Sequence, residues 1–215
     1  MSNKIYPHRI DGVAKKKSEE QKRPYELGKR LAQMDKSRAD ILRAAQALLE
    51  ANGYRQLTMA SLAAESGVTR QTVHNLFGTK AAVLEALFDV IALDGGMEKM
   101  REAMTQPTAE AMLERFVGVF CGFWKSNRVL LRRIRGIGAI DPEFGAVLEA
   151  RNKRRTMAAT RIVGRYGVKG DAKQKVAALT ALTSFEFFDG LVEGGVDEES
   201  AAEIILGLAR MLLLL

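Results

Sequence analysis

The sequence predicts an all-α protein of about nine helices. Apolar residues recur at helical spacing along most of the 215 residues, only 4 prolines interrupt them, and no strand-like alternation or hairpin dipeptide competes. With 47% hydrophobic residues, the chain is long enough to bury a core in one or two small domains.

The few cysteines and histidines argue against a metal site or a disulfide. Cys121 is the single cysteine, so neither an internal disulfide nor a cysteine-cluster metal site can form. The two histidines, His8 and His74, are far apart in sequence and have no ligand-like spacing. We therefore expect no metal and no cofactor.

The sequence also carries no recognisable targeting or membrane segment. Its start has no apolar stretch of the kind that a signal peptide needs. The longest apolar run, residues 204–215, is too short to span a bilayer and carries Arg210. We expect a protein of the reducing cytoplasm with no membrane partner.

Positive charge is concentrated in two segments. Residues 1–38 carry eleven basic and five acidic side chains, and residues 105–170 carry thirteen and five, within a net charge of +7. A basic balance favours a polyanionic partner such as nucleic acid. Residues 1–35 have few large apolar side chains and are predicted to form a flexible basic arm. This arm is either a solvated tail or a source of additional phosphate or minor-groove contacts.

Four helices are predicted over residues 37–90, and cap residues delimit each of them. The first begins at Ser37 and ends at Gly53. The second and third are only about two turns long, because glycines follow closely on their N-caps. The N-caps of the second, third and fourth helices are Thr58, Thr69 and Thr79, and the glycines are Gly67 and Gly78.

Helices of two turns are unstable alone, because helix nucleation is costly, so they must pack on the first helix and leave an outer face free. On the third helix this face is polar. Arg70 and Gln71 can form paired hydrogen bonds with guanine and adenine edges, and helix starts attract phosphate. The candidate DNA-binding residues are Thr58, Thr69, Arg70, Gln71, Thr72, His74, Asn75 and Lys80.

The stretch "TMASLAAESGVTRQTVHNLFGTKAAVLEALF" resembles the helix-turn-helix of the tetracycline-repressor (TetR) family, and the similarity covers about residues 37–90. The resemblance implies a homodimeric transcription regulator whose helical C-terminal domain binds a small molecule. It also implies that Thr58 and Lys80 bind phosphates, while Thr69, Arg70, Gln71, Thr72 and Asn75 face bases or nearby backbone. The chain departs from the family pattern at His74, Leu76 and Gly78.

The remaining residues, 91–215, are predicted to form a helical effector-binding and dimerisation domain, next to a DNA-binding domain over 36–90. Aromatic residues at helical spacing there either line an apolar pocket or belong to an ordinary core. Arginines on one stripe of the following helix, and later those of the stretch "RNKRR" (residues 151–155), are either solvated or bind an anionic effector, such as a carboxylate or a coenzyme A thioester. The candidate ligand-binding residues are Phe116, Phe120, Trp124 and Arg128.

Two helices within 171–215 carry more apolar surface than one small bundle needs, which predicts a homodimer through them. One carries Phe187 and the other carries Ile205 and Leu208. The alternative is an ordinary monomer core. Gly95 and Gly96 are expected to end the fourth helix or to let it bend.

These observations predict a ligand-responsive DNA-binding regulator, expected to be a repressor, that binds a palindromic operator as a dimer. An unidentified small molecule is expected to release it from DNA. This effector is expected to be apolar, and whether it is also anionic is left open. One rival is a basic architectural protein that binds DNA without sequence specificity, but it leaves the apolar C-terminal half unexplained. The other is a helical enzyme, which would need a nucleophile–base pair or a metal site. The carboxylates of Glu186, Asp189 and Glu193 share a stripe without a histidine pattern, so we expect no enzyme.

Overall fold

The computed structural model describes the backbone of residues 11–214 and the side chains from Gly28 onward, Asn52 excepted. Within this part of the chain there are eleven α-helices and two 3-10 helices and no strand, which confirms the all-α class. The helices beyond the expected nine are the short α5 (Met100–Ala103) and a division of the segment 171–193 into α9 (Ala172–Leu182) and α10 (Phe185–Glu193). No helix among these residues is long and apolar enough to cross a membrane.

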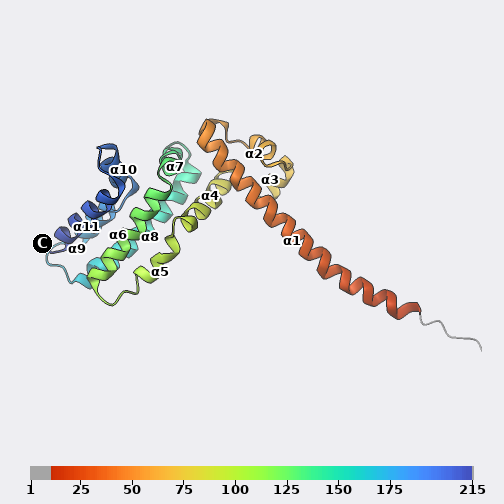
Figure 1. Cartoon of the computed structure of the whole chain (residues 1–215), viewed down its shortest axis with the longest axis horizontal. Coiled ribbons are helices and arrows are strands. Elements are labelled where there is room, and N and C mark those ends of the chain that lie inside the picture. Colours follow the sequence, from red (N-terminus) through yellow and green to blue (C-terminus); the bar gives the residue numbers. More distant parts are fainter. Residues whose placement is uncertain (1–10, 215) are drawn as a thin grey trace, which may run out of the picture.

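The first helix, α1, spans Asp11–Asn52 and runs out from the body of the molecule, with α2 and α3 packed beside its C-terminal end (Figure 1). The predicted helix start at Ser37 is therefore wrong. Residues 11–36 are rich in lysine and glutamate, which are strong helix formers, so the helix does not stop where the apolar stripe ends. Residues 1–10 of the predicted arm lie outside the described residues.

The N-terminal unit is a three-helix cluster on the end of α1. A 3-10 turn, η1 (Tyr54–Gln56), leads into α2 (Met59–Ser66), which is followed by α3 (Arg70–Phe77) and α4 (Lys80–Asp94). The threonines predicted as N-caps of α2, α3 and α4 accept a hydrogen bond from a backbone N–H of the first turn, as expected. Fully buried side chains from all four helices form the core of this unit: Ile41, Leu49, Leu62, Val73 and Leu84.

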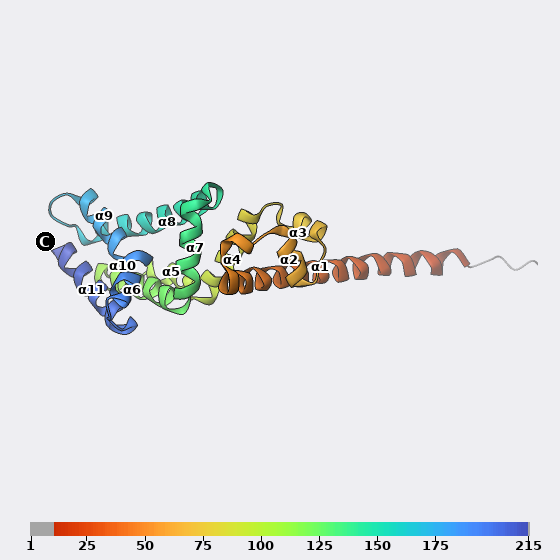
Figure 2. The ribbon, with the colours of Figure 1, turned by 90° about the horizontal axis from the view of Figure 1, so that it is seen from above.

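The C-terminal unit is a bundle in which α6 (Ala109–Ser126) is central. This helix packs against α5, α8, α10 and α11, and its apolar residues are buried on several sides, as its sequence predicts. Viewed from above, α6, α10 and α11 lie together at the end of the molecule remote from α1 (Figure 2). The remaining elements are η2 (Met97–Lys99), α7 (Arg128–Ile140), α8 (Pro142–Tyr166) and α11 (Glu198–Leu214).

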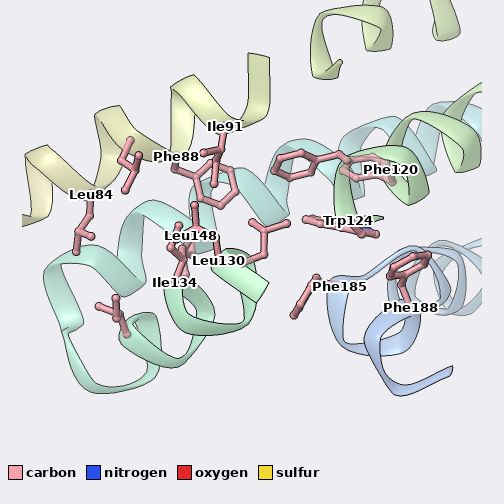
Figure 3. Close-up of a cluster of buried hydrophobic side chains, with 14 of the residues drawn as sticks. Leu84, Phe88, Ile91, Phe120, Trp124, Leu130, Ile134, Leu148, Phe185 and Phe188 are labelled. Carbon is pink, nitrogen blue, oxygen red and sulfur yellow. The ribbon is translucent and has the colours of Figure 1, made fainter. Parts of the chain in front are cut away.

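The fourth helix joins the two units, because its buried residues belong to both. Leu84, near the start of α4, lies in the same apolar cluster as residues of α7, and Phe88 and Ile91 face α6 and α8 (Figure 3). The rings of Phe88 and Phe123 meet edge to face at 5.8 Å. One apolar core therefore continues from the helix-turn-helix into the bundle.

The corner between α7 and α8 is packed through two glycines. A Cβ on Gly145 would lie 2.6 Å from the backbone oxygen of Gly138, so only glycine allows this approach. Asp141 caps α8 and Pro142 occupies its first turn, where a proline needs no hydrogen-bond donor. The corner places Asp141 and Glu143 against the N-terminal unit.

Candidate nucleic-acid interface and apolar cavity

The recognition-type helix α3 is fixed at both ends and along its inner face. Thr69 caps it, accepting a hydrogen bond from Thr72 N at 3.0 Å, and the two hydroxyls lie 2.8 Å apart. Gly67 turns the chain in the left-handed conformation at φ 69°. Val73 is fully buried beneath the helix. These contacts hold an eight-residue helix that could not persist alone.

The outer face of α3 consists of exposed polar side chains that are partly ordered by one another. Gln71 Nε2 donates to Asn75 Oδ1 at 2.7 Å. The second amide hydrogen and the Oε1 of Gln71 remain available, so this contact still permits a two-point contact with adenine. His74 Nδ1 lies 3.0 Å from the backbone oxygen of Gly78, which closes the C-terminal end of the helix.

The structure brings the eight predicted DNA-binding residues onto α3 and the starts of α2 and α4. Thr58 and Ser61 form a reciprocal capping box at the start of α2. Lys80 is half-buried, and its Nζ lies 3.7 Å from the centroid of the Tyr54 ring. Thr72 is also half-buried, and the other six are exposed: Thr58, Thr69, Arg70, Gln71, His74 and Asn75.

Contacts from the α7–α8 corner to this surface were not foreseen from the sequence. Tyr54 donates its hydroxyl to Asp141, and Thr79 Oγ1 donates to Glu143 Oε1 at 3.1 Å. The Tyr54 hydrogen bond, followed by that of the Phe144 backbone N–H, lowers the pKa of Asp141. The partners are about 60 to 90 residues apart in sequence, so no local pattern joins them.

The helical bundle contains a cavity of about 260 Å³ between α4, α6 and α8. Phe120 and Trp124, two of the candidate ligand-binding residues, line it. Phe116 does not line it; this residue is fully buried behind the cavity wall, with its ring centroid 5.1 Å from that of Phe120. Arg128 lies elsewhere, because its guanidinium is bound to Asp189 at 2.7 Å and to Glu193 at 2.5 Å.

The arginine stripe of α7 packs against the carboxylate stripe of α10. Arg132 also binds Asp189, at 2.8 Å, and Arg135 binds Glu186. Burial raises the pKa of Asp189, but the hydrogen bonds from Arg132 and Arg128 outweigh it and leave that pKa below its usual value. These carboxylates are engaged in ion pairs, and the described residues contain no cluster of histidine, cysteine, aspartate and glutamate suited to a metal ion.

The cavity also has a cationic wall. Arg135, Arg151, Arg154 and Arg155 line it. The stretch "RNKRR" is basic, but its charge alone does not distinguish the buried Arg155 from an exposed neighbour such as Lys153. The distinguishing signal is that Arg155 falls on the same helical face as Leu148, Ala159 and Ile162, which are buried.

The last helix presents two faces. Ile205, which we expected at a dimer interface, is fully buried within the protomer, as is Leu179. Leu208, also expected there, is exposed, and Phe187 is half-buried. The exposed apolar residues of α11 recur on its outer face: Ile204, Leu208, Met211 and Leu214.

The chain is similar in sequence to known regulators. Residues 41–87 match the model for bacterial regulatory proteins of the tetR family. Over 157 residues the chain is 26% identical to the HTH-type transcriptional regulator EthR of Mycolicibacterium smegmatis, an alignment that covers 72% of each protein.

Solved structures share its fold. A TetR transcription regulator from Haloarcula marismortui superposes with a TM-score of 0.64 at 17% identity, covering 82% of this chain and 96% of that one. A TetR-family regulator from Streptomyces coelicolor gives a TM-score of 0.62 at 21% identity, covering 83% and 95%. A protein from Saccharomonospora viridis described as a transcriptional regulator, in complex with choline, gives 0.63 at 18% identity, covering 82% and 96%.

Proposed function

We propose that this DNA-binding transcriptional regulator of the TetR family is a ligand-responsive repressor that binds a palindromic operator as a homodimer. This family is non-enzymatic, so the alternative of a helical enzyme is excluded. The observation that carries the proposal is the outer face of α3, where exposed hydrogen-bonding side chains stand on a helix fixed by caps and by buried Val73.

The role proposed for each residue in DNA binding follows from the position of its side chain. Arg70 and Gln71 lie in the first turn of α3 and are exposed, so they read base edges in the major groove. Thr58 and Lys80, at the starts of α2 and α4, bind phosphates, where backbone N–H groups add to the attraction. Asn75 orients Gln71 through their hydrogen bond.

A dimer is proposed because one α3 helix reads only half of an operator. Two-fold readers place their recognition helices about 34–36 Å apart, to meet successive turns of the major groove. The outer face of α11, with Ile204, Leu208 and Met211, supplies an apolar surface for a second copy. A dimer through these helices would fix the distance between the two α3 helices.

Control by a small molecule is proposed to act through α4. This helix starts at Lys80, beside the DNA-facing surface, and its residues Phe88 and Ala92 line the cavity. Its end at Asp94 is capped by Gly95, where an added Cβ would lie 2.5 Å from Phe123 Cδ2 of α6. A ligand that moves α6 therefore displaces the end of α4, and a coupling of about 1–3 kcal/mol changes operator affinity some 5- to 150-fold. The choline complex of the Saccharomonospora viridis protein supports a ligand in this fold.

Selection of binding sites from a random DNA pool tests the proposal. We expect enrichment of one sequence with two-fold symmetry, bound by a dimer. Arg70→Ala or Gln71→Ala should cost about 1–3 kcal/mol on that site and relax base preference at one position in each half. If no sequence is enriched and the affinity for DNA falls steeply as salt is added, the protein is instead a non-specific architectural DNA-binding protein.

A further inference from the structure

Arg155 of α8 is a buried cation that forms no ion pair within the described part of the chain. Only 7% of the residue is exposed, and its Nε has no hydrogen-bond partner among the described residues. Burial, and then repulsion by Arg135, lowers its pKa to about 10. Glu186 opposes this effect, but its carboxylate is already paired with Arg135. An uncompensated buried charge is costly, which indicates that an anion from outside the chain completes the site.

Apart from Asn152, the polar side chains that line the cavity around Arg155 are cationic. The cavity is lined by four arginines and, within the described residues, by no acidic side chain. Aromatic rings lie against two of the guanidinium groups: Arg151 is 4.5 Å from the centroid of Phe88, and Arg155 is 5.8 Å from that of Phe120. Arg151 also pairs with Asp89 at 2.7 Å, but its Nε is buried without a partner as well.

The rest of the cavity is apolar. Phe88 from α4 and Phe120 and Trp124 from α6 converge on it (Figure 3). Met97 and Met100 add flexible thioether side chains that can adapt to an occupant. The volume of about 260 Å³ is slightly below the usual range for drug-sized ligands, so the occupant is small.

We propose that this cavity is the effector site of the regulator proposed above, and that Arg155 binds the carboxylate of a small amphipathic acid whose apolar body packs against Phe120 and Trp124. A guanidinium presents a planar pair of N–H donors that matches a carboxylate. A neutral ligand would leave Arg155 uncompensated, and a cationic one would be repelled by Arg155, whose charge no ion pair within the described residues offsets. The expected effector class is therefore a monocarboxylic acid with an apolar tail.

Titration calorimetry of the full chain without DNA tests the class of ligand. The probes are nonanoate, nonanamide and protonated nonylamine, which share one apolar chain and differ in the head group. Nonanoate should bind at least about tenfold more tightly than nonanamide, as expected for a charge-assisted hydrogen bond, and nonylamine should not bind. Trp124 is the single tryptophan, so its emission should change with nonanoate.

Arg155→Met and Arg161→Gln test the residue. In Arg155→Met, nonanoate affinity should fall by about 10- to 100-fold, to that of nonanamide. The thermal midpoint of the ligand-free variant should stay the same or rise, because a buried unpaired charge is replaced by an apolar side chain. Arg161 is exposed on the same helix and does not line the cavity, so Arg161→Gln should change neither quantity.

Three results would overturn the proposal: no nonanoate binding, equal binding of nonanoate and nonanamide to the wild type, or a retained carboxylate preference in Arg155→Met. The wild-type comparison requires no variant, so it holds even if Arg155→Met does not fold. A different result would contradict the proposed function rather than the proposed ligand site. If nonanoate binds in an Arg155-dependent way but leaves operator affinity unchanged, the site stands and the release mechanism is wrong.

Discussion

Tyr54, in the turn after α1, donates its hydroxyl to the carboxylate of Asp141, the residue that caps α8. The ring of the same tyrosine lies beneath the Nζ of Lys80 at the start of α4. Thr79, the N-cap of α4, reaches Glu143 of α8. These contacts connect the α7–α8 corner to the helix starts that are proposed to bind phosphate. The corner is therefore a second connection, besides α4, between the bundle and the DNA-facing surface.

Tyr54→Phe should measure the strength of that connection, because it removes the hydroxyl and keeps the ring under Lys80. We expect the free energy of unfolding in urea to fall by about 1–2 kcal/mol, since the acceptor is a charged carboxylate. Asp141→Asn is the matched partner variant, because asparagine also caps a helix. A double-mutant cycle should give an interaction energy of about 1 kcal/mol. Strictly additive effects would show that the contact contributes nothing.

Asn75→Ala should change base selectivity and leave overall attraction to DNA intact. Asn75 orients Gln71 through a 2.7 Å hydrogen bond, so its loss should relax discrimination at the base pair that Gln71 reads, by about 1 kcal/mol. Lys80→Ala is the contrasting variant, expected to weaken binding evenly across sequences and to reduce the salt slope by about 1. Binding to the selected operator and to its single-base variants separates the two. An even loss in Asn75→Ala would place that residue on the phosphates instead.

The ion pairs of Asp189 should make the free energy of unfolding depend on pH in the acid range. The folded-state pKa of Asp189 lies below its unfolded value, because the hydrogen bonds from Arg132 and Arg128 outweigh burial. Its contribution is therefore complete above the unfolded pKa of about 3.9 and is lost as pH falls through the folded-state pKa. Asp189→Asn should lower the free energy of unfolding by about 1–3 kcal/mol at pH 7, and the difference should shrink in acid. A difference that is constant down to about pH 3 would contradict this account.

Much of the local structure is predictable because short sequence patterns mark the ends of helices. Thr58, Thr69 and Thr79 are predicted as N-caps, and each side chain accepts a hydrogen bond from a first-turn N–H. The start of α1 was missed, because the cap at Ser37 marks only where burial begins, and helix formers extend upstream of it. Short-range patterns therefore located the caps of α2, α3 and α4 better than the start of the long helix α1.

Pairings between distant segments could not be predicted from those patterns. The arginines of α7 and the carboxylates of α10 were each recognised as helical stripes, but only the fold shows that they face each other. Arg128 was considered as an anchor for an anion, whereas Arg155 has the buried and uncompensated charge that such a role needs. Helical periodicity indicates which residues share a face; packing decides what that face meets.

The outer face of α11 is the surface on which the dimer prediction depends. Its inner face, including Ile205 and Ala209, is fully buried within the protomer. Leu208 and Met211 are 38% and 64% exposed on the other side of the helix, next to half-buried residues of the same element. A substitution on the outer face can therefore disturb association without opening the core of the protomer.

Leu208→Glu should give a folded monomer that binds the operator poorly. A charge at Leu208 would be desolvated in the proposed interface without a partner, and it would stay in water in the free protomer. Met157→Glu is the control, because Met157 is 71% exposed on α8, away from α11. Sedimentation should show a dimer for the wild type and Met157→Glu and a monomer for Leu208→Glu, with unchanged helix content in all three. If Leu208→Glu is still a dimer, the interface lies elsewhere on the protein. If the wild type is a monomer and still binds a palindrome tightly, the prediction of a dimer is wrong.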